Sequence, residues 1–119
     1  METPYTILKT VAEEMESAAK QHVVRPKEML EKAALGIFPD ELMRIVILDG
    51  VTWRFQFSHD QIKEGVYFRH LSFGRSDSAE PTKEFQQLIK EVFFGDSEVV
   101  PFPSIWGGSV VHLMSPVTK

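Results

Sequence analysis

The sequence predicts an α+β protein, in which an N-terminal helical arm precedes an antiparallel β-β-β-α-β core with one long helix packed on its sheet. Three observations predict this class. Apolar residues recur every three or four positions before residue 40 and again after residue 80, as in amphipathic helices. Between residues 43 and 73 they alternate with polar residues, as in half-buried strands. Asp49-Gly50, between two of these runs, is a strong hairpin signal.

The arm is expected over residues 1–42 and contains two helices. Thr3 caps the first helix and Pro4 suits its first position. The residue before Pro26 avoids the α region, so the first helix ends at about Gln21, and a second helix runs from Pro26 to a cap at Gly36. Small and apolar side chains form the face of the first helix: Leu8, Val11, Ala12, Met15, Ala18 and Ala19. The arm either packs on the exposed sheet face or forms a homodimer through its helices.

The core is expected over residues 43–119 and begins with three strands, at residues 44–48, 51–58 and 66–73. These form a meander, because short polar segments join them. The polar run His59-Asp60-Gln61 predicts the start of a turn between the second and third strands. Large apolar residues alternate along the second strand and give it an aromatic inner face: Val51, Trp53, Phe55 and Phe57.

The longest helix of the core is expected from Pro81 to Gly95. Its apolar residues have the spacing of a single helix face, so it should cover the aromatic side of the sheet. These residues are Phe85, Leu88, Ile89, Val92 and Phe93. Pro101 and Pro103 argue against a central strand over residues 99–106, and a last strand is expected at residues 109–114.

The composition excludes several classes of function. The chain has no cysteine, which removes disulfides, thiol nucleophiles and cysteine-based metal sites. Its net charge of −4 is spread along the chain without a basic stripe, so we expect no nucleic-acid partner. No apolar run approaches the roughly 20 residues that span a bilayer, and the N-terminus lacks signal-peptide features. We therefore expect a cytoplasmic protein without a membrane contact.

The four histidines show no metal-ligand spacing, and no phosphate-binding glycine loop is present, so we expect no metal and no cofactor. His70 and His112 lie on predicted strands and are candidates for acid–base catalysis if the sheet brings them together. The alternative is that each is an ordinary hydrogen-bonded strand residue. His59-Asp60 is a further candidate at a strand end, and the alternative there is a polar turn.

Two sets of residues are candidates for partner binding. Arg54 and Arg69 lie on neighbouring predicted strands, and both are expected outside the aromatic face. They could bind an acidic partner there. The alternative is that they pair across strands with carboxylates. The segment 99–108 holds Phe102, Ile105 and Trp106 between prolines and glycines. These side chains either close over the core or are displayed to a partner.

The core contains three short motifs: His70-Leu71-Ser72, a helix ending Phe93-Phe94-Gly95, and Val111-His112-Leu113. Over about residues 43–114, these motifs resemble a family of small bacteriophage and prophage proteins of unknown function. The resemblance implies a mobile-element context in a bacterial host cell and transfers no catalytic residue.

The leading hypothesis is a phage or prophage accessory protein that acts by binding a host or phage protein. Its narrower form is an inhibitor of a bacterial defence system, similar in role to anti-CRISPR proteins. One alternative is a small hydrolase or nuclease that uses His70 and His112, together with Ser72 or a nearby carboxylate. The other alternative is a structural dimerisation module.

Overall fold

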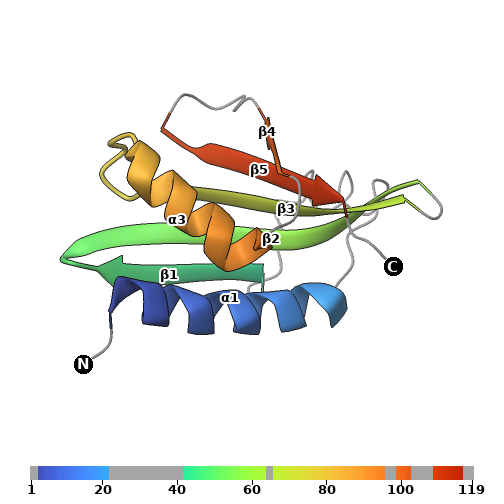
Figure 1. The fold of residues 1–119 in the computed structure, drawn as a ribbon, viewed down its shortest axis with the longest axis horizontal. Helices are drawn as coiled ribbons and strands as arrows, with labels where there is room; N and C mark the ends of the chain where they lie inside the picture. Colours follow the sequence, from blue (N-terminus) through green and yellow to red (C-terminus); the bar gives the residue numbers. More distant parts are fainter. Residues whose placement is uncertain (1–2, 22–41, 64–65, 96–98, 103–108, 117–119) are drawn as a thin grey trace, which may run out of the picture.

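In the part of the chain that the structure describes, five antiparallel strands form one sheet, and two helices lie against one of its faces (Figure 1). The computed structural model describes residues 3–21, 42–63, 66–95, 99–102 and 109–116, and for residues 60–63 and 100–102 it describes the backbone only. In chain order the elements are α1 (Pro4–Gln21), β1 (Met43–Leu48), β2 (Val51–Lys63), β3 (Val66–Arg75), α3 (Lys83–Phe94), β4 (Val100–Phe102) and β5 (Val111–Pro116).

The strand order in the sheet is β1-β2-β3-β5-β4. The first three strands form the predicted meander, and β5 then pairs with β3. Asp49 and Gly50 join β1 to β2 with positive φ angles of 49° and 80°. Both central residues of a type I′ hairpin turn require positive φ, which is why this dipeptide predicts the turn correctly.

The inner face of the sheet, which the helices cover, carries the aromatic residues of the core. The register places Phe55 opposite Phe73 and Phe57 opposite Leu71. The ring of Phe93 from α3 lies 5.8 Å from Phe55 and 5.5 Å from Phe57, measured between centroids. The predicted covering of the aromatic face by this helix is therefore confirmed.

α3 has the predicted amphipathic pattern and two defined ends. Thr82 is its N-cap and accepts a hydrogen bond from the backbone N–H of Phe85 at 3.2 Å. Gly95 ends it with a φ of 60°, and its N–H donates to the carbonyl of Glu91 at 3.0 Å. Ile89 and Phe93 are buried on the inner side.

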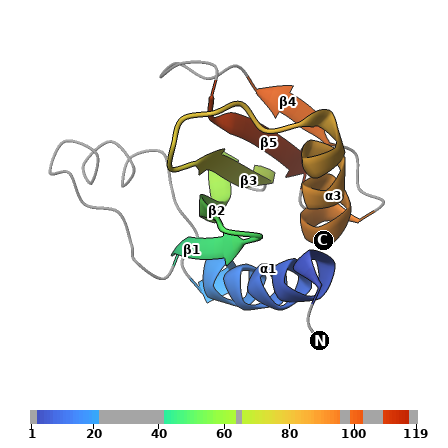
Figure 2. The same ribbon diagram turned by 90° about the vertical axis from the view of Figure 1, so that its left-hand side faces the viewer.

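α1 packs on the same face of the sheet, so it belongs to the core (Figure 2). Thr3 caps it as predicted, with its Oγ1 accepting from the N–H of Thr6 at 3.2 Å. Its apolar face is buried against the sheet and α3, through Leu8, Val11, Ala12, Met15 and Ala19. Of the two arrangements predicted for the helical arm, this helix therefore packs on the sheet, but on the face that α3 covers and not on the exposed one. The apolar face of an amphipathic helix is stabilised where it meets a second apolar surface, and the inner face of the sheet supplies that surface. The second predicted helix, residues 26–36, lies outside the described residues.

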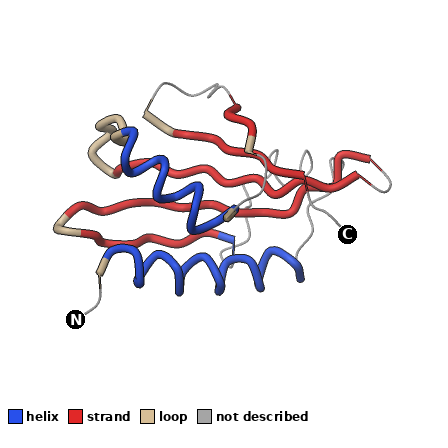
Figure 3. Tube along the Cα trace, in the orientation of Figure 1, coloured by secondary structure: helices blue, strands red, loops and turns tan. Residues whose placement is uncertain are grey.

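β2 and β3 continue beyond their predicted ends, side by side (Figure 3). The predicted turn at His59-Asp60-Gln61 is wrong, because these residues pair with Arg69, Phe68 and Tyr67 in the ladder. Strand pairing to a long neighbour overrides the polar local sequence here. The register is interrupted only afterwards, between Gln61 and Lys63.

The predicted β-β-β-α-β order also lacks one strand. Val100–Phe102 pairs with β5 as the short β4, which gives β-β-β-α-β-β after α1. β4 lies at the edge of the sheet, where a proline is tolerated because one side of the strand needs no ladder hydrogen bond. The argument against a central strand at this segment is therefore confirmed. Within the described ranges, no helix is long and apolar enough to cross a membrane.

The contribution of α1 to the core is testable by substitution. We expect Leu8→Ala to lower the free energy of unfolding by about 2–5 kcal/mol, because it removes a fully buried side chain between α1 and the sheet. Tyr5→Ala on the same helix, where the side chain is 49% exposed, should change it by less than about 0.5 kcal/mol. Urea denaturation of both variants measures the difference; equal effects would contradict the placement of α1.

Candidate functional site on the outer face of the sheet

The outer face of the sheet is the face turned away from α1 and α3. Side chains alternate along each strand, so the residues between the buried core positions point to this face. On β1 and β2 these are Ile45, Ile47, Arg54 and Gln56, and on β3 and β5 they are His70, Ser72, His112 and Met114. Neither described helix covers them.

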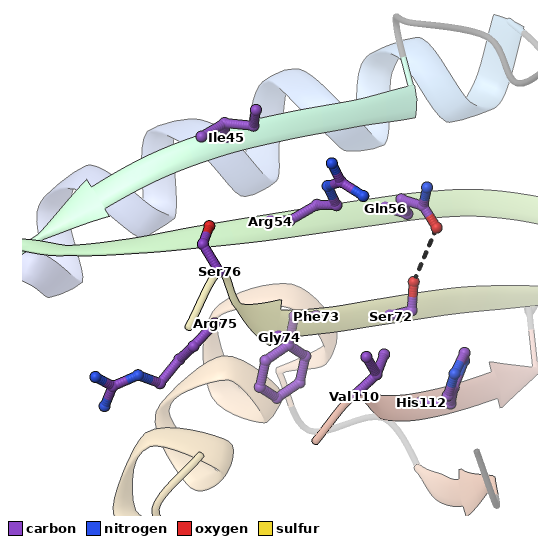
Figure 4. Close-up of a pocket in the computed structure, with 10 residues that line it drawn as sticks. All are labelled: Ile45, Arg54, Gln56, Ser72, Phe73, Gly74, Arg75, Ser76, Val110 and His112. Atoms are coloured by element: carbon purple, nitrogen blue, oxygen red, sulfur yellow. Dashed lines mark hydrogen bonds between the residues drawn. The ribbon is translucent and has the colours of Figure 1, made fainter. Parts of the chain in front are cut away.

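A hollow of about 490 Å³ lies on this face, over β1, β2, β3 and the start of β5 (Figure 4). Arg54, Gln56 and Ser72 lie next to one another at its centre, with Ile45 on one side and His112 on the other. The hydroxyl of Ser72 donates to Oε1 of Gln56 at 3.3 Å. None of the described residues that line the hollow is acidic. The hollow therefore combines donor groups with apolar side chains, which suits an acidic ligand.

Arg54 supplies the positive charge of the hollow. Its side chain is exposed, and none of the ion pairs between described residues involves it. Arg75 also borders the hollow but points away from its centre, where its guanidinium binds both carboxylate oxygens of Asp77 at 3.0 and 2.7 Å. An acidic partner would thus meet Arg54 as a guanidinium with its hydrogen-bonding capacity available.

Two large apolar side chains are exposed beside the hollow. Ile45 is 60% exposed and Ile47 is 67% exposed, both on the outer face of the edge strand β1. The alternate residues of β1, Val46 and Leu48, point to the inner face and are buried. Two exposed isoleucines beside the hollow make this edge of the sheet a candidate contact surface for another molecule.

The sheet brings His70 and His112 together, as acid–base catalysis by this pair would require. His70 lies opposite Met114 and His112 lies opposite Ser72, so the two imidazoles are diagonal neighbours on β3 and β5. Nε2 of His70 is 3.1 Å from Nδ1 of His112, and the ring planes differ by 22°. Burial lowers the pKa of His112, and the nearby charge of His70 lowers it further. The rings therefore form a hydrogen bond in which at least one of them is neutral.

Arg69 does not join Arg54. The register places Arg69 opposite His59 and Arg54 opposite Gly74, which puts Arg69 on the inner face and Arg54 on the outer face. The guanidinium of Arg69 lies 5.5 Å from the centre of the Phe94 ring. The predicted basic pair is wrong, because Arg69 points to the same face of β3 as Leu71 and Phe73, and this is the inner face.

A polar pair on the inner face, between the buried His59 and the half-buried Glu16, was not predicted. Nε2 of His59, which is 6% exposed, is 3.1 Å from Oε1 of Glu16 on α1. Burial raises the pKa of Glu16, but the hydrogen bond from His59 and the charges of His59, Arg69 and Lys20 outweigh it, so the pKa is lowered. Two signals were available in the sequence: His59 continues the alternation of Phe55 and Phe57, and Glu16, four residues after Ala12, lies at the edge of the apolar face of α1.

The other predicted binding residues give less structural information. Phe102 belongs to β4, and its side chain lies outside the described part of the chain, as do Ile105 and Trp106. Among the residues that the structure describes, no group of three or more His, Asp or Glu side chains is placed to hold a metal ion.

No protein-family model, curated protein or solved structure matched this chain. The phage and prophage context therefore stays an expectation drawn from the sequence motifs.

The Glu16–His59 pair makes the stability of the fold depend on pH. A carboxylate with a lowered pKa in the folded protein contributes stability above its unfolded pKa, near 4.3 on model peptides, and that stability is lost as the pH falls through the folded value. We expect Glu16→Gln to reduce the loss of stability between neutral pH and the acid range. Glu13→Gln, on the exposed side of α1, is the matched control.

Urea denaturation at a series of pH values measures both variants. Glu16→Ala should in addition cost about 1–3 kcal/mol at neutral pH, since it leaves a buried imidazole without this hydrogen bond. A pH profile for Glu16→Gln that coincides with the wild type would contradict this account.

Proposed function

We propose that this protein is a binding module that holds a protein partner on the outer face of its sheet. The observation that carries the proposal is the combination of Ile45 and Ile47 in solvent with an acid-free hollow around Arg54. Burying two isoleucines contributes affinity, and Arg54 selects an acidic side chain of the partner. The partner surface we expect is therefore apolar with a carboxylate close by.

Hydrogen bonding in the site favours binding over catalysis. The Ser72 hydroxyl has one proton, and it donates that proton to Gln56. A serine nucleophile would instead donate to a base such as His70 or His112. The two imidazoles are also hydrogen-bonded to each other through the nitrogens that face one another.

The wider role we propose follows the resemblance of the core motifs. In that context the protein is a phage or prophage accessory protein acting in the cytoplasm of a bacterial host. Its partner is a host or phage protein, and the narrower possibility is inhibition of a defence system. Phe102, Ile105 and Trp106 are proposed as a second contact surface for the same partner.

A small hydrolase or nuclease is the second candidate, and the 3.1 Å separation of His70 and His112 favours it. It predicts turnover that is lost in His70→Ala and in His112→Ala alike, because general acid–base catalysis contributes roughly 10²–10⁴-fold. Assays with ester, phosphodiester and nucleic-acid substrates test it. A dimerisation module through α1 is less consistent with the fold, since the apolar face of α1 is buried on its own sheet.

The binding proposal is tested with outer-face variants of the full-length chain. A partner is first identified by co-purification from the bacterial host and then prepared separately for calorimetry. We expect Ile47→Ser and Arg54→Glu each to weaken its binding by at least about tenfold, which corresponds to about 1.4 kcal/mol. Both side chains are exposed, so the fold should be retained.

Matched controls lie in the helical layer. Tyr5→Ser removes another exposed apolar side chain, and Lys83→Glu makes the same change of charge as Arg54→Glu at an exposed position. These controls should bind as the wild type does. The proposal fails if the outer-face variants also bind like the wild type, or if the controls weaken binding equally. The Phe102→Ala/Trp106→Ala double variant tests the second surface separately.

A further inference from the structure

The hollow on the outer face is shaped by the residues that flank Arg54 across the sheet. The register places Ile45 beside Arg54 on β1 and Gly74 beside it on β3. Gly74 leaves a gap, because a Cβ added there would lie only 3.3 Å from the carbonyl oxygen of Ser109 and 3.4 Å from Cγ2 of Val110. A glycine inside a strand is often found where a ligand or another backbone approaches closely. Arg54 is therefore bordered by one apolar side chain, and by a gap with a second apolar side chain beyond it.

Two donor groups lie side by side at the centre of this hollow. Arg54 and Gln56 are two residues apart on β2, so their side chains point to the same face, roughly 7 Å apart along the strand. The hydroxyl of Ser72 donates to Oε1 of Gln56, which leaves the amide nitrogen and its two N–H donors turned away from Ser72 (Figure 4). A guanidinium next to an amide donor suits the two oxygens of a single carboxylate.

The charge of the hollow discriminates between classes of oxyanion. Arg75 is neutralised by Asp77, and its hydrogen bonds to that carboxylate lower the pKa of Asp77. His112 is uncharged at neutral pH, chiefly because burial lowers its pKa. Among the described residues that line the hollow, Arg54 therefore supplies the uncompensated positive charge. This single charge matches a carboxylate, whereas a phosphate monoester carries about −1.5 to −2 at neutral pH.

We propose that the hollow binds a small organic molecule that has one carboxylate and an apolar body. The carboxylate accepts hydrogen bonds from Arg54 and Gln56, and the apolar body lies over Gly74, between Ile45 and Val110. The hollow has a volume of about 490 Å³, which falls within the roughly 300–1,000 Å³ of small-molecule sites and is more than a carboxylate group alone would fill. The proposal does not depend on the proposed protein partner, because it concerns the isolated chain.

Titration of the isolated full-length protein with benzoate, followed by ¹H–¹⁵N NMR, tests the site. Three further probes separate the parts of the ligand. Benzamide keeps the ring without the charge, acetate keeps the carboxylate without the ring, and phenyl phosphate replaces the carboxylate with a phosphate ester. We expect benzoate to bind more tightly than each of the three, and to shift the side-chain N–H resonances of Arg54 and Gln56.

Variants of the two donor residues identify the groups that bind. Arg54→Gln should weaken benzoate binding by at least about tenfold, because it removes both the charge and the guanidinium. Gln56→Glu should abolish binding, because it places a second carboxylate in the hollow. Lys83→Gln is the matched control: it removes one positive charge at an exposed position of α3 and should bind benzoate as the wild type does. Circular dichroism of each variant checks that the fold is retained.

Four outcomes would overturn the proposal. Acetate could bind as tightly as benzoate, which would indicate an adventitious ion only. Phenyl phosphate could bind more tightly than benzoate, which would contradict the charge of the site. Benzoate could shift resonances of α1 and α3 and not those of Arg54 and Gln56. The isolated chain could also fail to bind benzoate while Arg54→Glu still weakens binding of the protein partner, which would overturn this inference and leave the proposed function standing.

Discussion

The packing of aromatic rings on the inner face of the sheet is the constraint on which the other features depend. Trp53 stacks on Phe85 with a centroid separation of 4.0 Å, and Phe55 stacks on Phe73 at 5.9 Å. These contacts join β2, β3 and α3, and they leave an apolar surface that α1 completes with Leu8 and Met15. Because both helices are committed to this face, the opposite face of the sheet keeps no described helix of its own. The outer face is therefore left open, because both described helices cover the inner one.

The two faces of the sheet use their histidines in different ways. On the inner face, His59 lies under α1 and forms a hydrogen bond with Glu16. This hydrogen bond attaches the helix to the sheet. On the outer face, His70 and His112 contact each other beside a hollow. Burial decides this difference, since a buried polar group must be paired within the fold, whereas a half-buried pair beside a surface hollow remains within reach of a partner. The outer pair is for this reason the stronger functional candidate.

The local sequence predicted the turns and helix caps better than it predicted which strands and faces contact one another. The hairpin at Asp49-Gly50 and the cap at Thr3 were both correct, because turn and cap geometry depends on adjacent residues. The end of β2 was wrong, since the residues after Ser58 are held by β3 and not by their own propensity. Arg69 was placed on the wrong face because strand parity has to be counted from a paired neighbour, here Phe73 opposite Phe55.

The sequence by itself determined the α+β class, the β1–β2 hairpin, the aromatic face of β2 and the amphipathic helix α3, because each of these depends on the spacing of residues close together in the chain. It also excluded thiol chemistry, since the chain has no cysteine. Only the tertiary structure decided that α1 belongs to the core, that Arg54 and Arg69 lie on opposite faces, and that His70 meets His112 at 3.1 Å. The physical reason is common to all three: each depends on strand register and helix packing between segments distant in sequence, which local periodicity does not specify.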